Sequence, residues 1–196
     1  MHRRHLLGAG TLALFSLSSP VWAANAAEDF VSASILKGFD LLNDTSVGVA
    51  ERRQRFATFL LGLTDVRRVA MFLLGSYAVK ADAADIDAYV AAYRDYINSV
   101  YQSYFSLYAG QSLRVVSSRE RAPGDYVVST QITGGNAATP IDFRVKTDGP
   151  QPLLLDVAVG GVWLALAQRD QFMSVLAANN GDVKILTSHL RQIAHA

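Results

Sequence analysis

Apolar residues recur three and four positions apart between Ala27 and Gly110, which is the spacing of an amphipathic helix. The pattern predicts four helices there, at residues 28–43, 46–61, 65–76 and 83–108. Thr64 is a suitable N-cap for the third helix. The acidic residues between Asp82 and Asp87 lie at the start of the fourth, where the helix dipole favours negative charge.

After Gly110 the hydrophobic period changes to two, which indicates half-buried strands. Polar and apolar residues alternate over 126–132 and 141–146, and a further strand is expected at 153–159. Sequences rich in Gly, Pro and Asn separate the strands, at residues 123–124, 134–136 and 148–150. These three strands, together with a first strand in the segment that follows Gly110, predict a four-stranded antiparallel meander.

The helical period returns after Gly160-Gly161, over residues 162–178 and 182–193, with a turn at 179–181. The order along the chain is therefore helices, sheet and helices. A sheet with one apolar face needs a cover over that face. We predict an α+β fold in which helices pack on a four-stranded antiparallel sheet, as in NTF2-like folds, and enclose an apolar cavity.

The first 23 residues have the pattern of an export signal, with a basic start, an apolar run and small residues at a cleavage site. Their apolar run is too short to cross a membrane as a permanent helix, which needs roughly 20 apolar residues. Arg3-Arg4 suits twin-arginine export, but the general secretory route remains open, as does cleavage after Ala23 or after Ala26. We expect a periplasmic protein in which residues 24–196 form a single domain.

Composition excludes several kinds of chemistry. The chain contains no cysteine, so thiol chemistry and thiolate metal sites are excluded. Its formal charge is +1, without a clustered basic face, so no nucleic-acid partner is expected. Of its four histidines, two belong to the signal and the others, His189 and His195, lie at the C-terminus. We interpret carboxylate pairs such as Asp40/Asp44 as surface charge, and expect no catalytic residue, metal site or cofactor.

Tyrosines and apolar residues form a broad stripe along the fourth predicted helix, from Tyr89 to Tyr108. Core packing explains any one of these rings. A tyrosine, however, combines an apolar body with a hydroxyl that needs a partner, so a row of them suits a cavity with a polar mouth. The predicted lining residues are Phe59, Phe72, Leu73, Tyr77, Tyr93, Ile97, Val100, Tyr101, Tyr104, Phe105, Tyr108, Ile132, Ile141, Phe143, Val145, Leu155 and Val157.

Several sequence blocks resemble, in order, the MlaC or toluene-tolerance family of periplasmic phospholipid-binding proteins. They are FLLGSY at 72–77, the aromatic segment 89–110 that ends in YQSYFSLYAG, DVAVGGV at 156–162, and QRDQF at 168–172 followed by Asn180-Gly181 and Leu190. The chain also departs from the family pattern. Gly160 and Trp163 replace an acidic residue and a serine, and residues 78–80 replace an aromatic–arginine pair, which leaves the ligand and the docking partner open.

The resemblance implies a lipid carrier that is not an enzyme and uses no cofactor, with the predicted lining residues as its lipid-binding residues. It implies shuttling of phospholipid between an outer-membrane lipoprotein complex and an inner-membrane MCE-type ring coupled to an ABC transporter. Three alternatives remain. One is a carrier of hopanoid or sterol-type lipid, as in the hopanoid-associated HpnM branch. Another is an NTF2-like small-molecule enzyme, with Asp142, Arg144 and Asp156 as its interior polar candidates, and the last is an envelope adaptor with a filled core.

Overall fold

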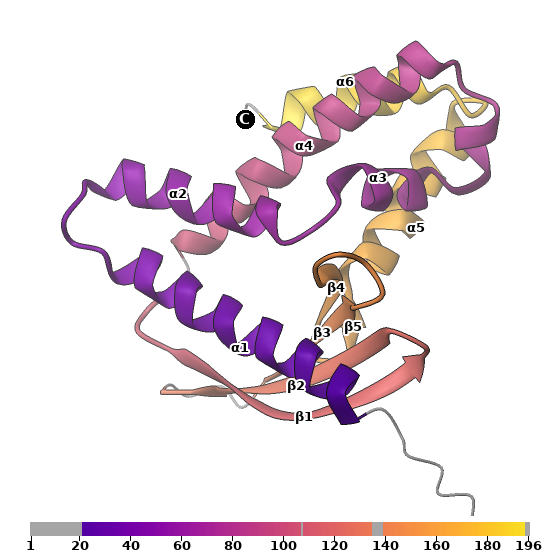
Figure 1. Cartoon of the computed structure of the whole chain (residues 1–196). Coiled ribbons are helices and arrows are strands. Elements are labelled where there is room, and N and C mark those ends of the chain that lie inside the picture. The colour runs from indigo at the N-terminus through magenta and orange to yellow at the C-terminus, as the bar shows by residue number, and fades with distance from the viewer. Residues whose placement is uncertain (1–20, 107, 135–138, 195–196) are drawn as a thin grey trace, which may run out of the picture.

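The computed structural model describes residues 21–106, 108–134 and 139–194 (Figure 1). Most of the expected signal, part of the turn predicted at 134–136 and His195 lie outside these residues. The helices are α1 Val21–Asn43, α2 Val49–Gly62, α3 Val66–Leu74, the 3-10 helix η1 Gly75–Val79, α4 Ala83–Phe105, α5 Leu164–Ala178 and α6 Val183–Ala194. The strands are β1 Ser112–Ala122, β2 Asp125–Thr133, β3 Pro140–Lys146, β4 Leu153–Val159 and β5 Val162–Trp163.

The five strands form one antiparallel sheet in the order β1-β2-β3-β4-β5, so each strand pairs with its neighbour in the chain. The predicted α+β class is confirmed, but the prediction of four strands is wrong. Gly160 and Gly161 have φ angles of 58° and 83°, which other residues rarely adopt, and they turn the chain back onto β4. The next two residues therefore pair with the end of β4 as β5, and α5 begins at Leu164 rather than at residue 162.

Local hydrogen bonds set helix ends that differ from the predicted ones. Asp65, not Thr64, is the N-cap of α3, and its side chain accepts a hydrogen bond from the backbone N–H of Arg68 at 3.0 Å. The Thr64 hydroxyl instead donates to the backbone carbonyl of Leu154 in β4 at 2.7 Å. It thereby ties the α2–α3 connection to the sheet. In addition, α2 starts later and α4 ends earlier than predicted.

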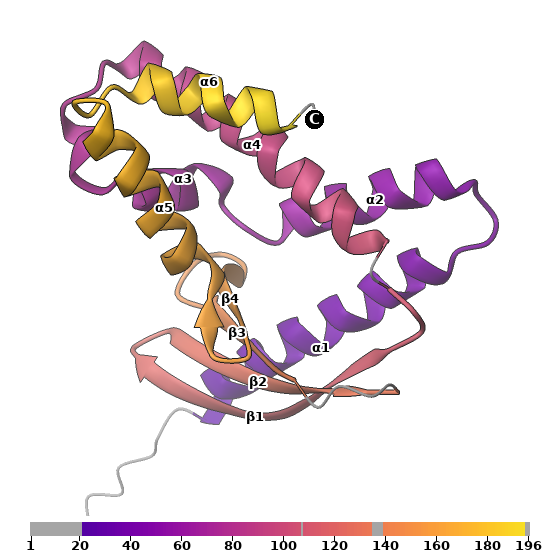
Figure 2. The same ribbon diagram turned by 180° about the vertical axis from the view of Figure 1, so that it is seen from behind.

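Helix α1 lies along one face of the sheet, over β1 and β2 (Figure 1 and Figure 2). Ala27 and Val31 of α1 pack against Tyr126, Val128 and Val145 of the sheet, and all five side chains are buried. We call these five residues the lower core. The start of α5 also meets the sheet, at β4 and β5.

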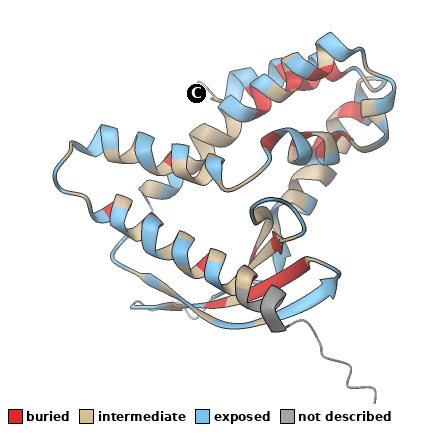
Figure 3. Ribbon diagram, in the orientation of Figure 1, coloured by how far each residue is buried: buried red, intermediate tan, exposed pale blue. Residues whose placement is uncertain are grey.

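The other helices build a second core away from the sheet, where α3, α4, α5 and α6 pack against one another (Figure 3). We call its buried residues the upper core, and they are Val66, Ala70, Leu73, Leu74, Ile86, Tyr89, Ala92, Tyr93, Phe172, Leu176, Val183, Leu186 and Leu190. The expected helical cover of the sheet is therefore mainly α1. The remaining helices bury their apolar faces against each other, so the molecule has two cores with room between them.

Candidate functional site

A pocket of about 820 Å³ lies between the lower core and the upper core. Its wall includes Val31 of the lower core and Val66 and Tyr93 of the upper core. Side chains from α1, α2, α4, β3, β4 and α5 supply most of the rest, and nearly all of them are apolar. Its size falls within the range of about 300–1,000 Å³ that is usual for ligand pockets.

Many of the residues predicted to line a cavity belong to the wall of this pocket, including five from the aromatic stripe and four from the strands that face it. The predicted residues on the wall are Phe59, Tyr93, Ile97, Val100, Tyr101, Tyr104, Ile141, Phe143, Leu155 and Val157. The structure places the other predicted residues elsewhere. These are Phe72, Leu73, Tyr77, Phe105, Tyr108, Ile132 and Val145.

The two cores account for some of the residues that lie off the wall. Leu73 is fully buried in the upper core, and Val145 is fully buried in the lower core. Tyr77 is packed against the upper core. Phe72 is 40% exposed on α3, where the Arg169 guanidinium carbon lies 4.7 Å from its ring centroid. These side chains point to faces of their helices and strand other than those that line the pocket.

The remaining predicted residues that lie off the pocket wall are at or near the ends of helices and strands. Tyr108 follows the last turn of α4, and its hydroxyl lies 3.1 Å from the Asn43 amide nitrogen, which donates to it. Ile132 is near the end of β2, where it pairs with Leu113 of β1. Phe105 is the last residue of α4 and lies next to the pocket residue Tyr104.

Helix α1 contributes a side of the pocket that the predicted lining left out. Phe30, Val31, Ile35, Phe39 and Leu42 all belong to the wall, together with Ser34 and Gly38. Their spacing of three and four residues is visible in the sequence, but it equally fits a helix that only packs on a sheet. Only the placement of α1 between the sheet and α2 shows that this face is shared with a pocket.

A chain of hydrogen bonds crosses one side of the pocket between α4 and α5. The Tyr93 hydroxyl donates to the Gln168 side-chain carbonyl at 3.1 Å, and the Gln168 amide donates to the Tyr96 hydroxyl at 3.2 Å. Burial raises the pKa of Tyr101 to about 12 and also raises the pKa of Tyr93. These hydroxyls are therefore neutral at physiological pH and can only act as hydrogen-bonding groups.

Asp156 of β4 places a carboxyl group in the otherwise apolar wall. One of its oxygens accepts hydrogen bonds from the backbone N–H of Val157 at 2.8 Å and of Ala165 at 2.9 Å. Ala165 lies in the first turn of α5, where the helix dipole favours a negative group. Burial nevertheless raises the pKa of Asp156, because these two hydrogen bonds and the charge of Arg144 offset only part of the desolvation.

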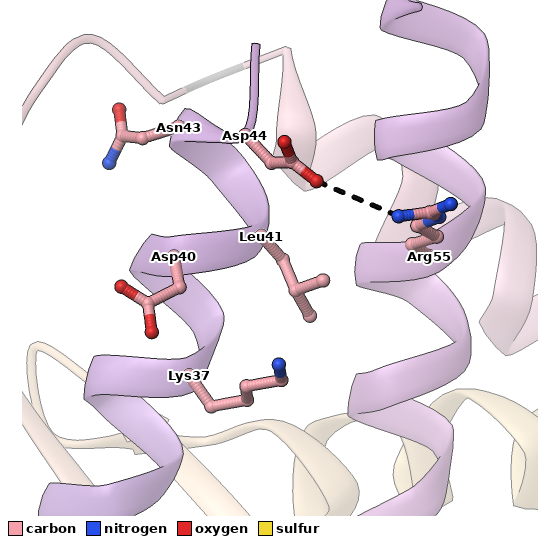
Figure 4. Close-up of a pocket in the computed structure, with 6 residues that line it drawn as sticks. All are labelled: Lys37, Asp40, Leu41, Asn43, Asp44 and Arg55. Atoms are coloured by element: carbon pink, nitrogen blue, oxygen red, sulfur yellow. Dashed lines mark ion pairs between the residues drawn. The ribbon is translucent and has the colours of Figure 1, made fainter. Parts of the chain in front are cut away.

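A second hollow, of about 440 Å³, lies between α1 and α2 and shares no residue with the pocket (Figure 4). Lys37, Asp40 and Asp44 come from α1 and the turn after it, and Arg55 comes from α2. One guanidinium nitrogen of Arg55 lies 3.6 Å from a carboxylate oxygen of Asp44, and the other terminal nitrogen lies 2.5 Å from one of Glu51. Of the charged residues that line this hollow, Asp44 and Arg55 therefore pair with each other.

In the part of the chain that the structure describes, no three His, Asp or Glu side chains lie close enough together to hold a metal ion. His189 is exposed on α6. None of the helices within residues 21–194, excluding the gaps, is long and apolar enough to cross a membrane. The site is thus a largely apolar pocket with a few hydrogen-bonding groups, the usual composition of a site for an apolar ligand.

Comparison with known proteins places this geometry in a family. The family model of the MlaC protein matches residues 36–192, which include α2 to α5, the whole sheet and most of the pocket wall. The chain belongs to the MlaC family. The resemblance found in the sequence is therefore confirmed at the level of the family.

A solved structure of similar fold is a phospholipid-binding protein from Ralstonia solanacearum in complex with a phospholipid. The two chains are 17% identical and superpose with a TM-score of 0.70, over 88% of this chain and 97% of the other. A likeness at this identity establishes the shared fold. No curated protein matches the sequence.

Proposed function

We propose that this MlaC-family protein is a periplasmic lipid carrier that holds a phospholipid by its acyl chains in the pocket between the two cores. The observation that carries the proposal is the pocket itself, a space of about 820 Å³ with nearly continuous apolar walls. The protein of similar fold from Ralstonia solanacearum is a phospholipid-binding protein in complex with a phospholipid, which supports the same class of ligand here.

The acyl chains would lie against three groups of side chains. Val100, Tyr101 and Tyr104 present the aromatic side of α4, whereas Phe143 and Val157 present the sheet. Helix α1 closes the third side. In this proposal the pocket serves as the apolar cavity of an NTF2-like carrier, and the lining residues act as its lipid-binding residues.

A protein with such a pocket solves a physical problem of lipid transport. Each methylene moved into water costs about 0.8 kcal/mol, so two acyl chains of roughly 30 methylenes in total would cost on the order of 24 kcal/mol to expose. Free diffusion of phospholipid through water is therefore prohibitive. The pocket replaces one apolar environment with another, which brings transfer between bilayer and protein close to balance and makes it reversible.

The cellular role follows the same proposal. Residues 1–23 act as the export signal, and residues 24–196 act as a single lipid-binding domain. The loaded domain shuttles lipid between an outer-membrane lipoprotein complex and an inner-membrane MCE-type ring coupled to an ABC transporter. It performs no reaction and needs no cofactor.

A second ligand class is favoured by one observation. The hydrogen bonds among Tyr93, Gln168 and Tyr96, with Asp156 on the same wall, supply polar contacts inside the pocket. Plain acyl chains make no use of such groups. A hopanoid or sterol-type lipid that carries a hydroxyl group could form hydrogen bonds with them.

Mass spectrometry of organic extracts from protein purified from the periplasm without detergent tests both candidates. The control is an unrelated periplasmic protein of equal purity. We expect phospholipid at close to one molecule per protein, and a hopanoid or sterol-type lipid at that level would select the second candidate. A blank extract from well-folded protein would contradict lipid carriage and favour the envelope-adaptor alternative.

A further inference from the structure

The face of α2 that lines the pocket changes character at its N-terminal end. Phe56, Phe59 and Leu60 belong to the pocket wall. The same helical spacing of three and four residues, continued toward the start of α2, leads to Arg52 and Arg53. The side of α2 that carries these pocket residues therefore begins with two arginines, just before the pocket wall, and continues with apolar side chains.

Both arginines lie over one aromatic ring at the end of the pocket. Each guanidinium carbon is 5.9 Å from the ring centroid of Phe105, within reach of a cation–π interaction. The Phe105 ring in turn lies 6.5 Å from the ring of Phe56, and its neighbour Tyr104 is on the pocket wall. The two positive charges thus lie where the apolar wall ends.

These arginines have hydrogen-bonding capacity that the described chain does not use. The Nε atoms of Arg52 and Arg53 are buried and lack a hydrogen-bond partner, and neither guanidinium forms an ion pair with another described residue. Buried donors without a partner are rare, because each forgoes the hydrogen bonds that water would make. Arg55, on the same helix, is by contrast paired with Glu51. It also pairs with Asp44, as Figure 4 shows.

Asp44, whose carboxyl feels the charge of Arg52, leaves this capacity open. Ser46 donates two hydrogen bonds to Asp44, and these lower the pKa of that carboxyl more than the charges of Arg55 and Arg52 do. Asp44 thus contributes a favourable field at Arg52 without bonding to it. It forms no ion pair with Arg53.

We propose that Arg52 and Arg53 bind the phosphate group of the lipid whose acyl chains occupy the pocket. The inference rests on the proposed lipid-carrier function and names the part of the ligand that the chain recognises. A guanidinium presents several N–H donors in a planar fork that matches two oxygens of a phosphate. Phe105 holds the two forks at the end of the apolar wall, at the point where a lipid passes from acyl chain to head group.

The experiment compares two lipids that differ only in the phosphate-containing head group. Delipidated protein is offered vesicles that contain either 1-palmitoyl-2-oleoyl phosphatidylglycerol or the diacylglycerol with the same chains, in a neutral host bilayer, and bound lipid is quantified after re-isolation. The variants are R52Q, R53Q and the double variant. R55Q is the matched control, because Arg55 lies on the same helix but is paired with acids. Circular dichroism and thermal unfolding verify the fold of each protein.

We expect the wild type to prefer phosphatidylglycerol, and each substitution at Arg52 or Arg53 to lower that preference about tenfold, the effect of one lost charge-assisted hydrogen bond. Binding of diacylglycerol should change little, and R55Q should behave as the wild type. A double variant with Lys at both positions, R52K/R53K, retains the charge and should keep part of the preference. If the Gln variants fold poorly, this Lys variant still tests whether the guanidinium groups contribute to the preference for phosphatidylglycerol.

Two results would overturn the phosphate site while leaving lipid carriage intact. One is equal binding of phosphatidylglycerol and diacylglycerol by the wild type. The other is an unchanged preference in the double variant, which would show that the arginines serve only to pack on Phe105. A wild type that takes up neither lipid would instead overturn the proposed carrier function, and the phosphate site with it.

Discussion

Asp156 is a carboxyl group in the wall of a pocket whose other side chains are mostly apolar. Its two backbone hydrogen bonds, from Val157 and Ala165, orient the group toward the start of α5. Burial still raises its pKa, so the charged form is less favourable in the folded protein than in the unfolded chain. The residue therefore joins β4 to α5 at some cost in stability at neutral pH.

The substitution Asp156→Asn should remove that cost and its pH dependence. An amide oxygen can accept the same two N–H groups but carries no charge. With its pKa raised, the folded protein binds this proton more tightly than the unfolded chain does, so the wild type gains stability from this group as the pH falls from neutral through the folded-state pKa. We expect the variant to have the higher free energy of unfolding at pH 7, with the difference shrinking toward pH 4.

Urea unfolding of both proteins across this pH range measures the effect. The variant's advantage should be small, because Asp156 is only partly buried. A variant that is less stable than the wild type at pH 7, with the gap closing at low pH, would show that the carboxylate charge stabilises α5 more than burial penalises it.

Single residues also show how much of the candidate site could be predicted from the sequence. Tyr93, Tyr101 and Tyr104 of α4 could be predicted as pocket residues, since the number and spacing of the tyrosines exceed what one packed helix needs. The role of Asp156 could not be, because its position depends on β4 meeting the start of α5. Arg52 and Arg53 have the appearance of ordinary surface charge until α4 brings Phe105 beneath them.

At the scale of elements, the turn between α5 and α6 determines how two helices of the upper core meet. Asn180 has a positive φ of 55°, and the Gly181 N–H donates to the Leu176 carbonyl at 2.7 Å, which is the hydrogen bond of a Schellman helix end. Gly181 itself has a φ of 79°, and a Cβ there would lie 2.7 Å from two ring atoms of Tyr77. The turn thus requires glycine for its conformation and for space.

Gly181→Ala should therefore destabilise the protein, by about 1–3 kcal/mol for the backbone conformation and more if the Tyr77 ring cannot move. Gly62→Ala is the matched control, because Gly62 is the last residue of α2 and nothing lies within 4 Å of a Cβ built on it. The control should be neutral or slightly stabilising. Urea unfolding compares the two, and equal effects would mean that the α5–α6 turn adapts without strain.

The elements themselves were largely predictable from hydrophobic period and turn residues, because both are local properties. The errors came from contacts distant in the sequence. The two-residue strand β5 is too short to show a period and exists only because it pairs with β4. Likewise, Thr64 was predicted as a helix cap, but it bonds instead to Leu154.

At the scale of the whole molecule, the division of the apolar residues into two cores creates the pocket. A sequence pattern identifies which residues are buried but not which of them are buried together. The predicted cover of helices over a sheet therefore missed that α3, α4, α5 and α6 would form a core of their own. Leu73 and Val145 were both predicted as lining residues and instead occupy the upper and lower cores.

If the space between the cores holds lipid, filling it should expel the lipid without unfolding the protein. Val157→Trp adds a large side chain to the pocket wall on β4, and Phe143→Asp places a charge on the neighbouring strand, opposite Val157. A buried charge opposes contact with acyl chains and also weakens the packing of Phe143 against the lower core. We expect both variants to lose most of the lipid that the wild type retains on purification.

Val116→Trp is the matched control for Val157→Trp, since Val116 is a strand valine that is 56% exposed and lies off the pocket wall. It should retain lipid as the wild type does. Lipid per protein is measured by mass spectrometry, with circular dichroism to show that each variant is folded. Because the two cores stabilise the fold on either side of the pocket, Val157→Trp should stay folded while empty, whereas undiminished lipid in the folded variant would place the bound lipid outside this pocket.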